Sequence, residues 1–171
     1  YQELADQMQH AVRTSEYASL IKSELDLESL LRTTLEYLIE KCGPCNVAIF
    51  LPSTSGEYEL GGYVNYDCTM DSADMMLQHM ADIVAPLVAE RNTPIHLTDN
   101  QMLTDWIGDD FIYLTDNHVL AFPCRCDPSQ MHAQNTSQSD DKSLASIILF
   151  RDSLHPFDTD LIDTLSAIGS L

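Results

Sequence analysis

Three stretches of the chain carry apolar residues at helical spacing. A recurrence every three or four residues predicts amphipathic helices rather than strands. These stretches cover 26–42, 72–91 and the C-terminal residues that follow Pro156. Asp26 can cap the first helix, and Gly43-Pro44 should end it, because glycine tolerates a left-handed backbone and proline cannot continue the hydrogen-bond ladder. Pro86 should kink or divide the second helix.

Shorter runs of apolar, β-branched and aromatic residues predict extended segments. They cover 46–51, 58–66, 94–97, 118–126 and 144–151. A turn rich in Pro, Ser, Thr and Gly at 52–57 joins the first two runs, which predicts an antiparallel hairpin. Gly61-Gly62 inside the second run indicates a bulge or a close approach to the backbone. Asp99 can cap a short helix that Gly108 would end.

The two ends of the chain suggest helical extensions. Residues 1–22 contain neither Gly nor Pro and predict a helix. A thin coiled-coil seam is formed by Leu4, Met8, Ala11, Ser15 and Ala18. This helix either packs back on the domain or pairs with a second copy, and we favour pairing. It begins without a cap, and the last helix ends with an apolar face still to continue. We therefore expect a helix at 1–22 and a domain at 23–171, both cut from a longer protein.

Acidic residues dominate the charge balance, with 27 Asp and Glu against 8 Lys and Arg and a formal net charge of −19. This balance argues against nucleic acid and against anionic membrane surfaces as partners. No apolar run approaches the roughly 20 residues that span a bilayer, and the first residues do not form a signal peptide. We expect a soluble cytoplasmic protein. The polar residues 127–143 predict a long loop.

Five cysteines occur in the chain, and an odd number without a secretion signal favours reduced thiols. Cys42-Gly43-Pro44-Cys45 has the spacing of a redox or zinc motif. A zinc site needs a second fitting pair of ligands. Cys124-Arg125-Cys126 is a poor second pair. On a strand, Arg125, the one cation adjacent to these thiols in the sequence, would face opposite to both of them. We favour ordinary core or surface cysteines over metal or redox chemistry.

The order of elements, together with several local sequences, resembles a GAF domain, a sensor module of histidine kinases and other signalling proteins. The matching segments are 25–31, 45–51, 119–124, 146–151 and 157–165. The resemblance covers about residues 23–171 and lies in order and spacing rather than in one motif. The last strand departs from the family's Ile-Gly-Val pattern, since it has Ala145-Ser146-Ile147 instead.

The resemblance implies an α+β, PAS-related fold with a mainly antiparallel sheet of five to six strands and helices on both faces. The first and last helices would cover one face. The helical excursion would cover the other and roof an apolar pocket. The candidates for its lining are Tyr63, Tyr66, Met76, His79, Met80, Trp106, Phe122 and Cys124. His79 is also the best candidate for a haem ligand, although a histidine at the edge of the core explains it better.

No catalytic or phosphate-binding motif is present, so we predict no catalytic residues, no metal ligands and no required cofactor. The chain lacks the Cys-His pair of bilin-binding relatives and the Asn-Lys-Phe-Asp-Glu signature of those that bind cyclic nucleotides. We expect a signal-relay domain that binds a small molecule, forms a homodimer through its terminal helices and acts on an effector domain in the same full-length chain. One alternative is a ligand-free dimerisation scaffold. The other is a cysteine redox enzyme similar to GAF-like methionine sulfoxide reductases, with Cys124 and Cys126 as its thiols; the acidic surroundings disfavour it.

Overall fold

A five-stranded sheet lies at the centre of the computed structural model, which describes residues 2–8, 27–68, 70–109, 112–125 and 143–169. Its strands are β1 (Asn46–Pro52), β2 (Tyr58–Val64), β3 (Ile95–Leu97), β4 (Asn117–Arg125) and β5 (Ser143–Asp152). They lie in the order β2-β1-β5-β4-β3, and every neighbouring pair is antiparallel. The predicted sheet of five to six mainly antiparallel strands is confirmed.

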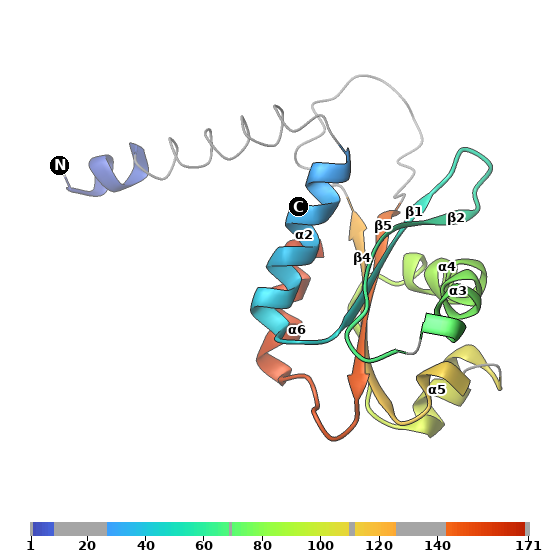
Figure 1. Cartoon of the computed structure of the whole chain (residues 1–171). Coiled ribbons are helices and arrows are strands. Elements are labelled where there is room, and N and C mark those ends of the chain that lie inside the picture. Colours follow the sequence, from blue (N-terminus) through green and yellow to red (C-terminus); the bar gives the residue numbers. More distant parts are fainter. Residues whose placement is uncertain (1, 9–26, 69, 110–111, 126–142, 170–171) are drawn as a thin grey trace. The chain divides into compact units, whose positions relative to one another are not determined.

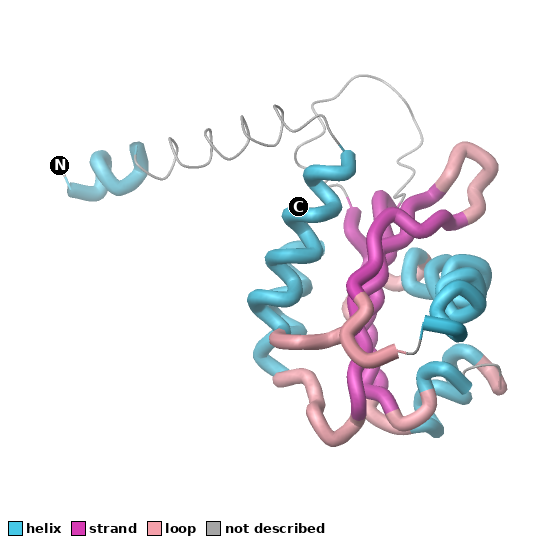
Figure 2. The backbone as a smooth tube through the Cα atoms, viewed as in Figure 1, coloured by secondary structure: helices cyan, strands magenta, loops and turns pink. Residues whose placement is uncertain are grey.

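Helices cover both faces of this sheet (Figures 1 and 2). In chain order they are α2 (Leu27–Cys42), α3 (Met70–His79), α4 (Ala85–Ala89), α5 (Asn100–Ile107) and α6 (Thr159–Gly169). A π-helical turn at Met80–Val84 joins α3 to α4, and a short 3-10 helix occupies Ile112–Leu114. The second half of α2 lies with α6 on one side of the sheet, and α3, α4 and α5 lie on the other (Figure 2). This arrangement was expected.

The chain divides into two units, Tyr1–Thr34 and Leu35–Leu171. In the first, residues 2–8 are helical, and Leu4 and Met8 are 63% and 64% exposed. The start of α2 belongs to the same unit and carries an Arg32–Glu28 ion pair of 3.6 Å. The remaining seam positions, Ala11, Ser15 and Ala18, fall outside the described residues, as do residues 127–142 of the loop predicted at 127–143. Ser143, the last residue of that predicted loop, begins β5 instead.

The central strands β1, β4 and β5 are buried on both faces. Side chains alternate along β4. Val119 and Ala121 join the core under α3, α4 and α5, whereas Leu120 and Phe122 lie on the face covered by α6. Each of the four is at most 1% exposed. The sheet therefore separates two apolar cores, and a side chain belongs to one or the other according to its register.

The β1–β2 hairpin contains the predicted bulge. Ile49 pairs with Gly62 and Phe50 with Leu60, so Gly61 has no partner in the register. A Cβ atom on Gly62 would lie 3.0 Å from Leu35 Cδ1, a tight contact that the Leu35 side chain would have to relieve by shifting. The second strand stops two residues earlier than expected.

The early end of β2 has a local cause. Asn65 accepts a hydrogen bond from Cys68 N and donates one to Cys68 O, both of 2.9 Å. These two contacts close a turn, so the backbone of Asn65 leaves the strand direction.

Pro86 divides the helical excursion, as its position predicted. Proline has no N–H to donate to the preceding turn, and the helix widens into a π turn immediately before α4. Ser146, fully buried in β5, donates a hydrogen bond of 2.9 Å to the Ala85 carbonyl oxygen at this break. Ser146 stands where the Ile-Gly-Val pattern has its glycine, and its hydroxyl anchors the helix break to the sheet.

We expect Ser146→Ala to lower the free energy of unfolding by about 1 kcal/mol, because it leaves a buried carbonyl without this donor. The control is Ser55→Ala, an exposed hydroxyl in the β1–β2 turn, which should change stability by less than about 0.5 kcal/mol. Urea denaturation of both variants and of the wild type measures these free energies of unfolding. Equal stability of S146A and the wild type would contradict the anchoring role of Ser146.

Candidate functional site

Four of the eight predicted pocket residues come together on the side of the sheet covered by α3, α4 and α5. Met76 and Met80 belong to the core there and are 3% and 0% exposed. Tyr63 from β2 and Trp106 from α5 pack against the same core. His79 lies at the end of α3, where its Nδ1 shares a hydrogen bond with the Tyr113 hydroxyl.

The other three predicted residues do not join this group. Phe122 and Cys124 lie on the alternate positions of β4 and therefore face the α6 side. Tyr66 follows the end of β2 and is 59% exposed. The sequence predicted the strands near which these three residues lie. It did not determine the register of the strands, and the register decides which face of the sheet a side chain occupies.

Two buried polar atoms on the α3–α5 side have no hydrogen bond of normal geometry among the described residues. They are the Tyr63 hydroxyl and Trp106 Nε1. Burial raises the pKa of Tyr63 well above its usual range, and a hydrogen-bonding contact with the Cys68 thiol and the Asp67 carboxylate raise it further. The Tyr63 hydroxyl therefore stays protonated and able to donate. Buried donors without partners are uncommon in folded proteins, and a bound polar group is one way to satisfy them.

The described cysteines are poor nucleophiles. Cys42 and Cys45 are buried at the junction of α2 and β1, and burial raises the pKa of Cys42 and brings that of Cys45 to about 12. Cys42 ends α2, where the helix dipole disfavours a negative charge. Burial also raises the pKa of Cys124 to about 11. Cys126, the other thiol considered for redox chemistry, falls outside the described residues.

We expect Cys45 and Cys124 to react with iodoacetamide at pH 8 at least about tenfold more slowly in the folded protein than in urea, because the thiolate is the reactive form. Mass spectrometry of tryptic peptides reports the alkylated fraction at each position. Reaction of Cys124 in the folded protein as fast as in urea would contradict its raised pKa and would support the alternative of a cysteine redox enzyme.

A pair of histidines, which the sequence analysis did not identify, lies on the α6 face. His96 of β3 and His118 of β4 approach edge to face with ring centroids 6.0 Å apart. His96 Nε2 and His118 Nδ1 are buried and have no hydrogen-bond partner among the described residues. Burial lowers the pKa of His96, and the neighbouring His118 lowers it further. The His96 ring is therefore best accommodated in the neutral form.

This arrangement predicts acid sensitivity. A free histidine has a pKa of about 6.5, and the folded-state pKa of His96 lies below it. The unfolded chain therefore binds the proton first, so stability is full above about pH 6.5 and declines as the pH falls below it. His96→Gln should make the fall in unfolding free energy between about pH 6.5 and 5 shallower, whereas His155→Gln, at an exposed position, should not. An unchanged slope in H96Q would show that His96 does not carry the effect.

Arg151 forms a junction between three segments at one end of the sheet. Its Nη1 donates to the Cys42 carbonyl oxygen at 2.8 Å, its Nε to that of His155 at 2.6 Å and its Nη2 to that of Pro156 at 2.8 Å. The guanidinium also lies 4.2 Å from the centroid of the Phe157 ring. Arg151 in β5 thus holds the end of α2 and the connection that enters α6.

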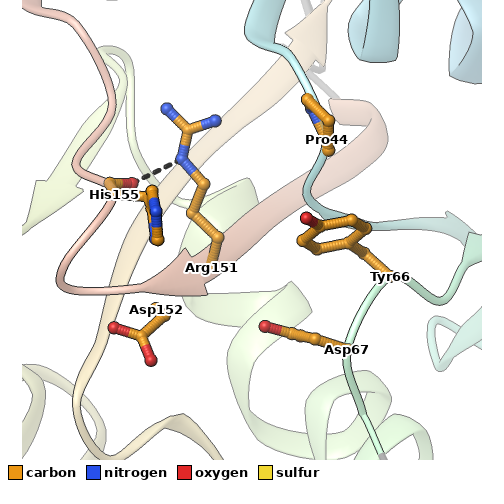
Figure 3. A pocket seen from close by; sticks show the side chains of 6 residues that line it. All are labelled: Pro44, Tyr66, Asp67, Arg151, Asp152 and His155. Carbon is orange, nitrogen blue, oxygen red and sulfur yellow. Dashed lines mark hydrogen bonds between the residues drawn. The ribbon is translucent and has the colours of Figure 1, made fainter.

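A cavity of about 590 Å³ opens beside this junction (Figure 3). It is lined by Pro44, Tyr66, Asp67, Arg151, Asp152 and His155. Only Tyr66 was among the predicted pocket residues. Within the described parts of the chain, no three His, Cys, Asp or Glu side chains are placed to hold a metal ion. The described helices also include none with the length and apolarity to cross a membrane.

No family model matches the sequence, and no curated protein is significantly similar to it. Solved structures do match. The GAF domain/HD domain protein from Geobacter sulfurreducens aligns over 85% of this chain and 88% of its own, with a TM-score of 0.58 and 11% identity. This chain has the GAF fold.

Two further structures support the GAF fold. A type II free methionine-R-sulfoxide reductase from Thermoplasma acidophilum covers 85% of this chain and 91% of its own, with a TM-score of 0.53 and 15% identity. A far-red cyanobacteriochrome photoreceptor covers 95% and 92%, with a TM-score of 0.51 and 15% identity. One fold thus occurs in an enzyme and in a photoreceptor, so the fold by itself does not decide the activity.

Proposed function

We propose that this chain is a regulatory GAF-fold module that senses a ligand or partner and relays the event through α2 and α6. The observation that supports it most is the Arg151 junction. The Arg151 guanidinium donates hydrogen bonds to the carbonyl oxygen of Cys42, the last residue of α2, and to two carbonyl oxygens in the connection to α6. A displacement of either helix end would strain hydrogen bonds that hold the other, so the two helices respond together.

The sensing side would be the face under α3, α4 and α5. Tyr63 and Trp106 come from β2 and α5 and pack against the core of this face. Trp106 Nε1 is buried without a hydrogen-bond partner among the described residues, whereas the Tyr63 hydroxyl has the Cys68 thiol beside it. A ligand with an acceptor group could satisfy Trp106 Nε1 while its apolar part contacts Met76 and Met80. Methionine side chains adapt readily to such contacts. A ligand acts as a signal only if it prefers one of two conformations of the module.

Dimerisation through the terminal helices is part of the proposal. Leu4 and Met8 are exposed on the N-terminal helical segment, and Leu27 and Leu30 on the first turns of α2 are 55% and 39% exposed. An apolar stripe of this kind is typical of a helix that pairs with another helix. An effector domain in the same full-length chain would receive the change.

A ligand-free scaffold is the second candidate, and the complete burial of Met80 favours it, because side chains already fill that core. A thiol redox enzyme has less support. The resemblance to the sulfoxide reductase is one of fold, and the described thiols have raised pKa values.

Native mass spectrometry of the purified chain separates these functions. A dimer that carries extra non-covalent mass, absent under denaturing conditions, is the result expected for a ligand-binding relay module. Tyr63→Phe and Trp106→Phe should reduce the fraction that carries this mass, whereas Tyr37→Phe, on α2, should not. A dimer without extra mass would favour the scaffold. A monomer without extra mass would contradict both the dimer and the ligand.

A further inference from the structure

The cavity beside Arg151 has walls from three connections of the fold. Pro44 comes from the α2–β1 connection, Tyr66 and Asp67 from the segment after β2, and Asp152 and His155 from the end of β5 and the connection to α6. Figure 3 shows Tyr66 and Asp67 on one side of the opening and Asp152 and His155 on the other. A molecule in this cavity would therefore touch segments that lead into both terminal helices.

Buried hydrogen bonds hold one wall in place. Asn46 is fully buried, and its Nδ2 donates to Asp67 Oδ1 at 2.6 Å. Its Oδ1 accepts from Tyr66 N at 2.8 Å. On the opposite wall, Asp152 Oδ1 accepts from Leu154 N at 2.8 Å. Each carboxylate is thus oriented through one oxygen, and its second oxygen has no hydrogen-bond partner in the described part of the chain.

Neither carboxylate is neutralised by an ion pair with another described residue, because the Arg32–Glu28 contact is the one such pair found among them. Arg151 is the basic side chain of the lining, but its three nitrogens donate to backbone carbonyls. Its guanidinium extends away from Asp152 and Asp67 (Figure 3). The cavity therefore presents two negative groups and the exposed ring of Tyr66.

We propose that this cavity binds a small organic cation with one or two ammonium groups on a short aliphatic chain, of the diamine or polyamine class. Ammonium N–H groups would donate to the second oxygens of Asp67 and Asp152, and charge-assisted bonds of this kind are the stronger ones. The Tyr66 ring would contact the ammonium or the adjoining methylenes. The volume of about 590 Å³ is in the range of small-molecule sites.

This site is separate from the proposed sensing face, and its occupation can be tested without reference to any relay. Its position nevertheless adds a consequence. His155 lines the cavity, and its carbonyl oxygen accepts from Arg151 Nε. A bound cation would therefore contact the same connection that the junction holds.

Isothermal titration of the full chain with 1,4-diaminobutane and with spermidine, at low ionic strength, tests the proposal. Asp67→Asn combined with Asp152→Asn removes both charges and keeps the two Oδ1 acceptors. The matched control is Asp82→Asn combined with Asp105→Asn, two exposed carboxylates that each accept one hydrogen bond, in their case from a glutamine side chain. Each pair removes two of the 27 acidic charges. Tyr66→Leu, with Tyr37→Leu as its control, tests the aromatic wall without touching a charge.

The expected result is one bound cation per chain, weakened about tenfold or more in D67N/D152N, weakened in Y66L and changed less than about twofold in both controls. Absence of binding would overturn the proposal. So would an equal loss in the two double variants, which would indicate general attraction to an acidic protein. Tighter binding of Mg²⁺ than of the diamine, lost in D67N/D152N, would replace it with an inorganic-cation site.

Discussion

The hydrogen bonds of Arg151 are the constraint on which the arrangement of the terminal helices depends. Backbone carbonyls at the end of a helix have no partner within that helix and must find donors elsewhere. The Cys42 carbonyl finds Arg151, which lies 109 residues further along the chain. Because the same guanidinium binds His155 and Pro156, the end of α2 and the approach to α6 share one point of attachment on β5. Arginine suits this position, since its planar donors can bind several acceptors at once.

The two faces of the sheet differ in the elements that cover them. On the α6 face, Phe122 and Leu165 are buried, and α6 packs against β4. On the opposite face, the divided helix α3–α4 rests on β5 through the Ser146 hydroxyl. Irregular helical turns of this kind are frequent at functional sites. The module therefore has a regular side that attaches to the terminal helices and a less regular side where a ligand could be accommodated, with the Arg151 junction at one end of the sheet.

Local features of the fold could be predicted from the sequence because neighbouring residues determine them. Asp99 accepts a hydrogen bond from Met102 N, as a helix cap must, and Gly108 ends that helix with a positive φ of 86°. The bulge at Gly61 and the division before Pro86 follow in the same way from single residues. The order of elements was enough to indicate the GAF fold.

The site was harder to predict because it depends on contacts between distant segments. Phe122 and Cys124 were assigned to the pocket, but the register of β4 turns them to the other face. The Asn46 network and the contact between His96 and His118 join residues 20 or more positions apart. A three-residue strand such as β3 carries too little pattern for its register to be read from the sequence.

Hydrogen–deuterium exchange of Arg151→Met, compared with Arg151→Lys and the wild type, tests the central claim most directly. Lysine keeps the positive charge but cannot bind three carbonyls in one plane. The account predicts that amides in 35–42 and 159–165 exchange faster together in both variants, by about tenfold, while β3 and β4 keep their protection. If only the connection at 153–158 exchanges faster, and both helices keep wild-type protection, Arg151 does not couple them and the proposed relay loses its physical basis.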